Sequence, residues 1–198
     1  FKELGQSSLD AAERAFRTAL ERDSAAIDAY IGLAEGARRR GRPEVARSQL
    51  REAMTRAPRD ARPMAAMARL DASEGKTAAA LSWLEKAVAA DPKNAGAQTD
   101  LGDVYLQLLA KPQEAEAAYR RAVSLRPELA RPRVGLGLAL AARGSYLKAA
   151  NELRAAASLD TKDPAILHML GRVLAQQGDR VASYESFSGA LERNANFE

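Results

Sequence analysis

The sequence predicts an all-α protein in which antiparallel helix pairs repeat along the chain as an α-solenoid. Alanine, the best helix former, makes up about a fifth of the residues, well above its usual share. Two series of residues recur at intervals of 34 or 35 positions, namely Pro58, Pro92 and Pro127, and Gly102, Gly137 and Gly171. A fixed period of this length is the sequence signature of a stacked repeat array.

The period divides the chain into five full repeats and one partial repeat. The full repeats are placed at 27–60, 61–94, 95–129, 130–163 and 164–197. Residues 1–26 are expected to supply the end of one helix and a complete second helix. The whole chain, 1–198, is therefore predicted to be a single solenoid domain. Because Phe1 falls inside a helix and residues 196–198 stop where another repeat would begin, we expect the chain to be a fragment of a longer protein.

Each full repeat is predicted to contain two helices joined by a short turn. In 27–60, apolar residues follow helical three-and-four spacing on both sides of Gly41, as Tyr30, Leu33, Ala34 and Ala37 and then Ala46, Leu50, Ala53 and Met54. A glycine at this place is expected to adopt the left-handed conformation that ends the first helix, and this applies to Gly41, Gly75, Gly144 and Gly178.

Two repeats carry individual signals. The third has no turn glycine and holds one extra residue around 109–112, so its turn is predicted to be longer. The fifth opens with Asp163 and Pro164, which predict a helix start because aspartate caps free amides and proline is tolerated at the first helical position.

With these residues in register, the pattern resembles the tetratricopeptide repeat. The third repeat matches that motif at Leu101, Gly102, Tyr105, Ala115, Tyr119, Ala122, Val123 and Pro127. The fourth and fifth match it at Leu136, Gly137, Gly144, Ala149, Leu170, Gly171, Gly178, Phe187 and Ala190. The resemblance covers the whole chain and implies a right-handed superhelix of antiparallel helix pairs. It also implies a protein that binds other polypeptides and catalyses nothing.

Stacking explains why small and large residues recur at fixed repeat positions. Gly102, Gly137 and Gly171 are expected where the first helix of a repeat crosses its second, because a missing Cβ lets the backbones approach; Ala34 and Ala68 act similarly. Large residues are expected to oppose them at one repeat position, as Phe16, Leu50, Leu84, Tyr119, Leu153 and Phe187.

The resemblance further implies that the first helix of each repeat lines a concave binding groove. The residues that this assigns to ligand contact are Arg38, Arg62, Arg69, Asp103, Leu106, Arg131, Val134, Leu138, His168 and Arg172. The arginines favour an acidic segment, since guanidinium groups pair with carboxylates, and the leucines and valine favour apolar side chains. The alternative is that these arginines are merely solvated on an exposed helix face.

One ligand class of the family is not expected. Its chaperone-binding members hold a C-terminal carboxylate with lysine and asparagine at defined first-helix positions. The corresponding residues here are Ile31, Glu35, Ala66, Arg131 and Gly135. The sequence therefore does not predict that clamp.

The sequence gives little support for a metal site, an enzymatic site or a nucleic-acid site. The chain has no cysteine and one histidine, His168, so neither a metal site nor an enzymatic site is expected, and no cofactor is implied. The arginine run at 38–42 is typical of a nucleic-acid-binding patch. However, it lies at a predicted helix C-terminus, where cations are favoured by the helix dipole, and no aromatic residues that could stack on bases accompany it. We therefore expect no nucleic-acid partner, and we expect Trp83 to pack between repeats.

The function expected from the resemblance is a scaffold or adaptor in a bacterial multi-protein assembly, such as a pilus, a secretion system or envelope polysaccharide export. A non-catalytic arm of a larger enzyme, such as a transferase, is the alternative. Homo-oligomerisation through uncapped ends stays open. The longest apolar run, 135–142, is far shorter than the roughly 18 residues of a membrane span, and the compartment is left open between cytoplasm and periplasm.

Overall fold

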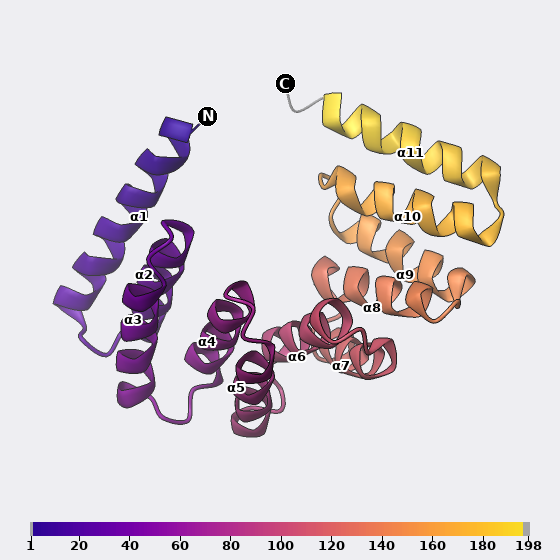
Figure 1. The fold of residues 1–198 in the computed structure, drawn as a ribbon. Helices are drawn as coiled ribbons and strands as arrows, with labels where there is room; N and C mark the ends of the chain where they lie inside the picture. The colour runs from indigo at the N-terminus through magenta and orange to yellow at the C-terminus, as the bar shows by residue number, and fades with distance from the viewer. Residues whose placement is uncertain (1, 196–198) are drawn as a thin grey trace. The chain divides into compact units, whose positions relative to one another are not determined.

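The chain folds into helices throughout the part that the computed structural model describes, the backbone of residues 2–195 and the side chains of residues 8–194 (Figure 1). Within that range there is no strand. The elements are α1 (Lys2–Arg22), α2 (Ile27–Arg39), α3 (Pro43–Arg56), α4 (Ala61–Ser73), α5 (Thr77–Ala90), α6 (Ala95–Asp103), the π-helical segment η1 (Val104–Leu108), α7 (Pro112–Leu125), α8 (Ala130–Ala142), α9 (Tyr146–Leu159), α10 (Pro164–Gln177) and α11 (Arg180–Ala195). The predicted all-α class is confirmed. Phe1 and residues 196–198, on which the expectation about the chain ends rests, lie outside the described residues.

The helices form two compact units, Phe1–Ala97 and Gln98–Glu198. In the first unit α2 pairs with α3 and α4 with α5, while α1 packs on α2. In the second, α8 pairs with α9 and α10 with α11, while α7 packs against η1 and α8. Each unit is thus a stack of helical hairpins, as the repeat predicts, and the single domain over 1–198 stays a prediction.

The first helix differs from the expectation for residues 1–26. Lys2–Arg22 is one continuous helix of 21 residues, so the expected break between the end of one helix and a second helix is wrong. The physical reason lies in the sequence: the first proline is Pro43, and a single glycine, Gly5, costs a helix interior only about 1 kcal/mol.

The turns within repeats follow the prediction where a glycine is present. The four turn glycines have left-handed backbones, with φ of 67° at Gly41, 75° at Gly75, 75° at Gly144 and 90° at Gly178. At the start of α10, the Asp163 carboxylate accepts a hydrogen bond from the Ala165 amide at 2.8 Å, with Pro164 in the first turn. Both the turn signal and the helix-start signal are confirmed.

The third repeat accommodates its extra residue in another way than expected. Its turn, 109–111, has three residues, as do the turns at 74–76 and 143–145, so the predicted longer turn is wrong. The extra residue lies in the helix, where the Leu109 amide donates to the Val104 carbonyl five residues back at 3.1 Å. A π-helical turn absorbs one inserted residue without ending the helix. Ala110 then takes the left-handed conformation, with φ of 51°.

The predicted contacts between small and large residues are present. A Cβ added at Gly102 would lie 2.7 Å from the Tyr119 ring, and one at Gly171 would lie 2.8 Å from the Phe187 ring. A Cβ at Gly135, in the following repeat, would also overlap the Tyr119 ring, which the sequence did not predict. Of the six large residues, Leu50, Leu84, Tyr119 and Leu153 are buried, whereas Phe16 and Phe187 are half-buried.

Ion pairs join successive repeats at one recurring pair of positions. The second helix of one repeat meets the first-helix end of the next in the pairs Glu13–Arg40, Arg47–Glu74 and Glu116–Arg143. In each pair the residues are 27 positions apart; the acidic residue comes first in the pairs of Glu13 and Glu116, and the arginine comes first in the pair of Arg47. Arg47 also pairs with the buried Asp71 at 2.8 Å. These ion pairs help to position the first helices, and the first helices carry the predicted ligand contacts.

Candidate functional site

The residues predicted to contact a ligand all lie on the first helices of their repeats, whose exposed surfaces we call the first-helix faces. Those in the first unit are Arg38 on α2 and Arg62 and Arg69 on α4. Those in the second unit are Asp103 on α6, Leu106 on η1, Arg131, Val134 and Leu138 on α8, and His168 and Arg172 on α10. The two sets are described separately because they belong to different units.

On α2, the predicted contact Arg38 is held by a carboxylate of its own helix. Its Nε and Nη2 atoms donate to the two Glu35 oxygens, both at 2.8 Å. Arg39 donates to the same carboxylate at 2.8 Å. The Arg38 hydrogen bonds, opposed by burial, lower the Glu35 pKa to about 2. The space between α2 and α4 beside this group is only ≈ 10 Å³. The contact between α2 and α4 therefore leaves no room for a ligand side chain.

On α4, Arg62 meets two carboxylates. Its Nη2 lies 2.7 Å from Asp60 Oδ2 and its Nη1 lies 2.6 Å from Asp28 Oδ1. Asp60 is also the N-cap of α4 and accepts from the Arg62 amide at 2.9 Å. Hydrogen bonds from Arg62 hold the Asp60 pKa below its usual value. Two acidic groups therefore offset the positive charge of this predicted contact. Arg69, further along α4, is exposed.

In the second unit, Arg131 is held in the same way. Its Nη2 lies 2.7 Å from Asp100 Oδ1 and 2.5 Å from Asp103 Oδ2. The Tyr119 hydroxyl donates to the other Asp103 oxygen at 2.6 Å. Burial, aided by that carboxylate, raises the pKa of Tyr119 well above its usual value, so the phenol stays a donor. This network ties the surface arginine to the core of the third repeat.

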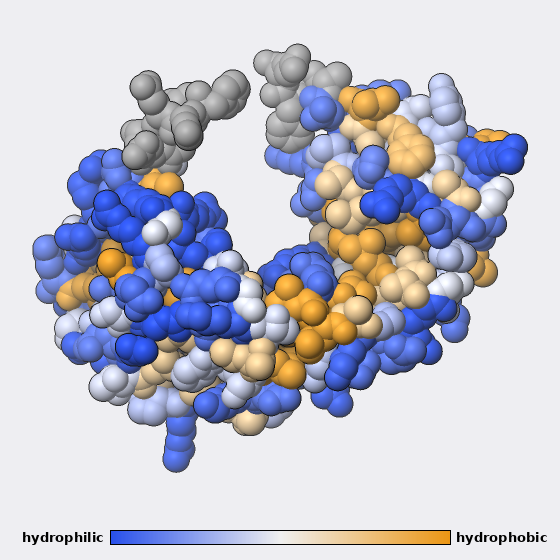
Figure 2. Space-filling view, viewed as in Figure 1, coloured by the Kyte–Doolittle hydropathy of each residue, from blue (hydrophilic) through white to orange (hydrophobic). Residues whose placement is uncertain are grey.

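Of the apolar contacts predicted in the second unit, Leu138 lines a hollow. Leu106 and Val134 are half-buried and pack against the core cluster of this unit. Leu138 helps to line a hollow of ≈ 210 Å³ between α8 and α10, together with Ala141, Tyr146, Met169, Arg172, Val173 and Gln176. Figure 2 shows apolar residues gathered over the helices of this unit, whereas the visible face of the first unit is mainly hydrophilic.

Arg172 differs from the arginines above. It is exposed at the rim of this hollow. Among the described side chains, residues 8–194, it has no hydrogen-bond or ion-pair partner. An unpaired guanidinium beside an apolar hollow can bind a carboxylate without first giving up another one.

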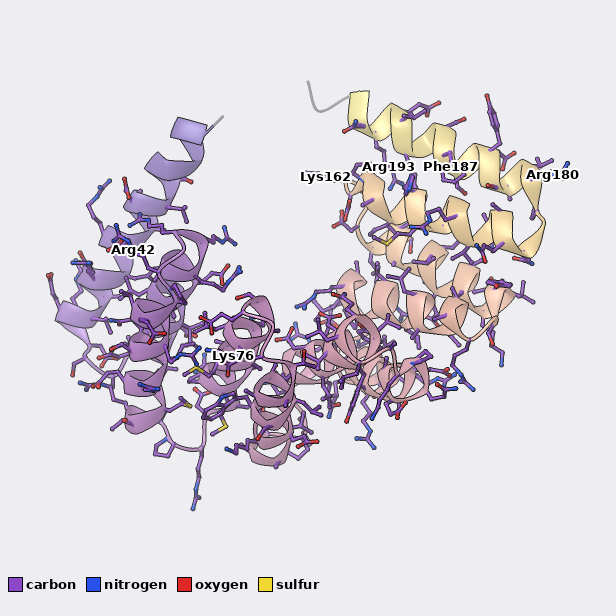
Figure 3. The ribbon with its side chains drawn as sticks, in the orientation of Figure 1. Arg42, Lys76, Lys162, Arg180, Phe187 and Arg193 are labelled. Carbon is purple, nitrogen blue, oxygen red and sulfur yellow. The ribbon has the colours of Figure 1, made fainter. Side chains whose placement is uncertain are left out.

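His168 lies beside a second apolar hollow. Its ring is 5.3 Å from the Phe187 ring at an interplanar angle of 56°, and Figure 3 shows Phe187 pointing from α11 towards α10. These two rings, with Ala190 and Leu191, help to line a space of ≈ 440 Å³. The described side chains, residues 8–194, contain no group of three or more His, Asp or Glu placed as metal ligands would be.

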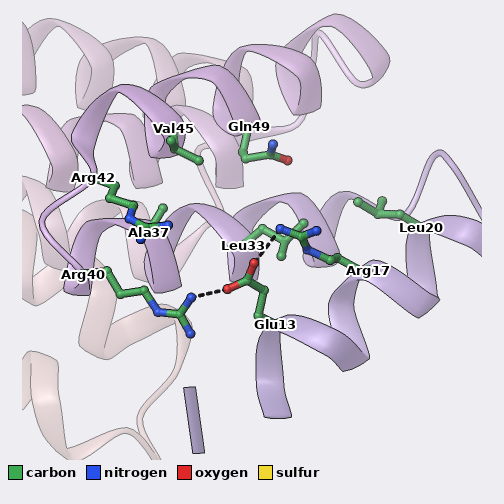
Figure 4. A pocket seen from close by; sticks show the side chains of 9 residues that line it. All are labelled: Glu13, Arg17, Leu20, Leu33, Ala37, Arg40, Arg42, Val45 and Gln49. Carbon is green, nitrogen blue, oxygen red and sulfur yellow. Dashed lines mark hydrogen bonds and ion pairs between the residues drawn. The ribbon is translucent and has the colours of Figure 1, made fainter. Parts of the chain in front are cut away.

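A third hollow, between α1, α2 and α3, was not predicted. It has a volume of ≈ 370 Å³ and is lined by Glu13, Arg17, Leu20, Leu33, Ala37, Arg40, Arg42, Val45 and Gln49 (Figure 4). Glu13 accepts from Arg17 at 2.6 Å and also pairs with Arg40. Opposite charges 27 positions apart were the sequence signal that could have located this contact between α1 and the end of α2.

The arginine run at 38–42 lies at a helix end, as the sequence predicted. It begins in the last turn of α2, and Arg40 pairs with Asp10 and Glu13. Trp83 is half-buried against the cluster that contains Leu50 and Met67, as expected for packing between repeats. The sequence analysis did not predict the carboxylates that pair with Arg62 and Arg131, although Asp28 and Asp100 lie 34 and 31 positions before these arginines.

Along residues 2–195, none of the helices has the length and apolar character that a membrane crossing requires.

Comparison with known proteins gives one family and several similar structures. The family model "Tetratricopeptide repeat" matches residues 3–62, 65–130 and 109–165. Residues 41–end of MamA from Desulfovibrio magneticus RS-1 are similar, with 24% identity, coverage of 86% of this chain and 96% of that chain, and a TM-score of 0.72. PilF of Pseudomonas aeruginosa has 21% identity, coverage of 92% and 83%, and a TM-score of 0.73.

A third similar structure, YrrB, is described as a TPR protein with an unusual peptide-binding site. It has 22% identity, coverage of 92% of this chain and 93% of that chain, and a TM-score of 0.65. No curated protein sequence gives a match to this chain. At these identities the likeness shows the fold.

Proposed function

Because the chain belongs to the tetratricopeptide repeat family, we propose that it is a non-catalytic scaffold or adaptor that binds a peptide or protein segment on its first-helix faces. The observation that carries this proposal is the surface of the second unit. There, half-buried Leu106 on η1 and Val134 on α8 pack against the core cluster, and Leu138 on α8 lines the hollow beside α10. Apolar side chains held at a surface with a few polar groups suit a polypeptide segment.

The chemistry of the partner follows from which charges are free. We propose a segment that carries both apolar and acidic residues, and that uses the second unit for its acidic contacts. Arg38, Arg62 and Arg131 already pair with carboxylates of this chain, so an acidic ligand would have to compete with those groups. Arg172 has no such competitor among the described side chains, residues 8–194.

The setting that we propose is a bacterial multi-protein assembly, such as a pilus, a secretion system or envelope polysaccharide export. This setting is proposed from the resemblance to the family, since the similar structures at 21–24% identity bear on the fold alone.

The experiment that tests binding on the first-helix faces is site-specific photo-crosslinking in cells. A photoreactive residue replaces Leu106 or Val134, and in a matched control it replaces Leu147, a leucine of the second helix α9 that is 62% exposed. We expect the same partner polypeptide to crosslink from both first-helix positions and not from the control. Equal crosslinking from all three positions, or none from Leu106 and Val134, would contradict the proposal.

Association of two copies is a second proposal, and α11 carries the observation that favours it. Tyr184 and Leu191 on this helix are 75% and 70% exposed. The residues 34 positions earlier on α9, Ala150 and Ala157, are buried, and α10 packs on that helix. The face of α9 that α10 covers thus has an exposed counterpart on α11 among the described side chains, and we propose that a second copy of this chain packs there.

A further inference from the structure

Each unit contains a contact between two successive first helices, which we call a joint, and the two joints lie at equivalent places in the repeat. One lies between α2 and α4 and the other between α8 and α10, and equivalent residues are 103 positions, or three repeats, apart. Glu35 and Arg38 of the first joint correspond to Leu138 and Ala141 of the second, and Arg69 corresponds to Arg172. The chain therefore contains two versions of one joint.

The two versions differ in whether they leave room for a ligand. In the α2–α4 joint the Glu35–Arg38 pair lies beside a space of only ≈ 10 Å³. In the α8–α10 joint, where Leu138 and Ala141 replace that pair, the space is ≈ 210 Å³. Its walls include Met169 and Val173, and Arg172 stands at its rim without a partner among the side chains of residues 8–194. The replacement of an ion pair by two apolar residues thus goes with an open hollow.

We infer that the α8–α10 hollow is the anchor point of the partner segment: it takes one aliphatic side chain, and Arg172 binds an Asp or Glu side-chain carboxylate of the same segment. This inference rests on the proposed function, because it assumes that the first-helix faces bind a polypeptide. The hollow is smaller than the roughly 300 Å³ at which pockets for small-molecule ligands begin, which suits a single side chain. A guanidinium group is well matched to a carboxylate because it donates two parallel hydrogen bonds.

The direct test uses the purified chain and short peptides with blocked ends. Each nine-residue peptide has a central leucine with glutamates two positions away on both sides, and comparison peptides replace the leucine by alanine or the glutamates by lysine. Binding is measured by fluorescence anisotropy. We expect the peptide with leucine and glutamate to bind at least about tenfold more tightly than either comparison peptide. Equal binding of the three, or no binding, would overturn the inference.

Methionine methyl groups locate the bound peptide. The chain has four methionines, and Met169 is the only one in the second unit, whereas Met54, Met64 and Met67 lie in the first. In a spectrum of ¹³C-methyl-methionine protein, the peptide should shift the Met169 resonance and leave the other three in place. Shifts confined to the first-unit methionines would place the peptide elsewhere and contradict the assignment.

Variants of both groups complete the test. Arg172→Glu should weaken the peptide at least about tenfold, whereas Arg154→Glu, at an exposed arginine of α9, should leave its affinity unchanged. The double variant Leu138→Glu with Ala141→Arg copies the ion pair of the α2–α4 joint and should also weaken binding at least about tenfold. Circular dichroism confirms that each variant is folded.

The outcomes separate this inference from the proposed function. If Arg172→Glu and the double variant bind the peptide as well as the original chain, the anchor assignment is wrong. Crosslinking from Leu106 and Val134 would still report whether the first-helix faces bind a partner. Failure of that crosslinking as well would reject the proposed function.

Discussion

At the scale of single residues, Ala110 shows how one turn does without its glycine. It has φ of 51°, whereas the turn glycines have φ between 67° and 90°. A left-handed backbone costs an alanine roughly 1–2 kcal/mol, part of which a glycine would lose again through its greater freedom in the unfolded chain. We expect Ala110→Gly to raise the free energy of unfolding by less than about 1 kcal/mol, measured by urea denaturation.

The matched change is Gly75→Ala, which should act in the opposite direction. A Cβ at Gly75 would meet nothing within 4 Å, so its cost arises from the backbone alone. With φ of 75°, we expect this variant to lose about 1–2 kcal/mol. A loss of similar size in both variants would show that the left-handed conformation does not decide the stability of these turns.

At the scale of helices, buried ion pairs fix how one repeat meets the next. Arg47 on α3 pairs with Asp71 and Glu74 near the end of α4, and the side chains of Arg47 and Asp71 are only 12% and 3% exposed. Removing the guanidinium leaves a buried carboxylate without its partner. We expect Arg47→Ala to lower the free energy of unfolding by about 3–5 kcal/mol, measured in the same denaturation experiment.

The control for Arg47 is an arginine whose ion pair is exposed. Arg56 pairs with Glu52 within α3, and their side chains are 35% and 47% exposed. Arg56→Ala should therefore lose at most about 1 kcal/mol. If the two alanine variants were equally stable, the pairs between repeats would contribute no more than surface charges do.

At the scale of the whole molecule, the open face of α11 predicts self-association. Light scattering after size-exclusion chromatography should show a mass that rises with concentration. Tyr184→Glu with Leu191→Glu should keep the chain monomeric, because two carboxylates would have to be buried in the contact.

The matched control for this prediction is Leu147→Glu. Leu147 is 62% exposed on α9 and lies away from the equivalent buried positions, so its change should leave association intact. A monomer at every concentration for the original chain, or association of the double variant to the same extent, would refute the proposed contact.

Much of the fold was predictable because each repeat carries the same signals at the same places. The turn glycines, the Asp163–Pro164 helix start and the close contacts of Gly102 and Gly171 all depend on neighbours within one hairpin. The predictions for residues 1–26 and for the third turn failed where the repeat pattern was imposed on a stretch that departs from it. A count of residues reveals an insertion but does not show that a π-helical turn will absorb it.

The sequence by itself determined the all-α class, the period and which residues lie on first helices, because these follow from local spacing and backbone preferences. Only the tertiary structure decided which of the predicted contacts are free. Arg62, Arg131 and Arg172 look alike in the sequence, yet the first two meet carboxylates and the third has no partner in the part of the chain whose side chains are described, residues 8–194. The physical reason is that pairing and open volume depend on side chains from several helices, and their distances are fixed only when the repeats stack.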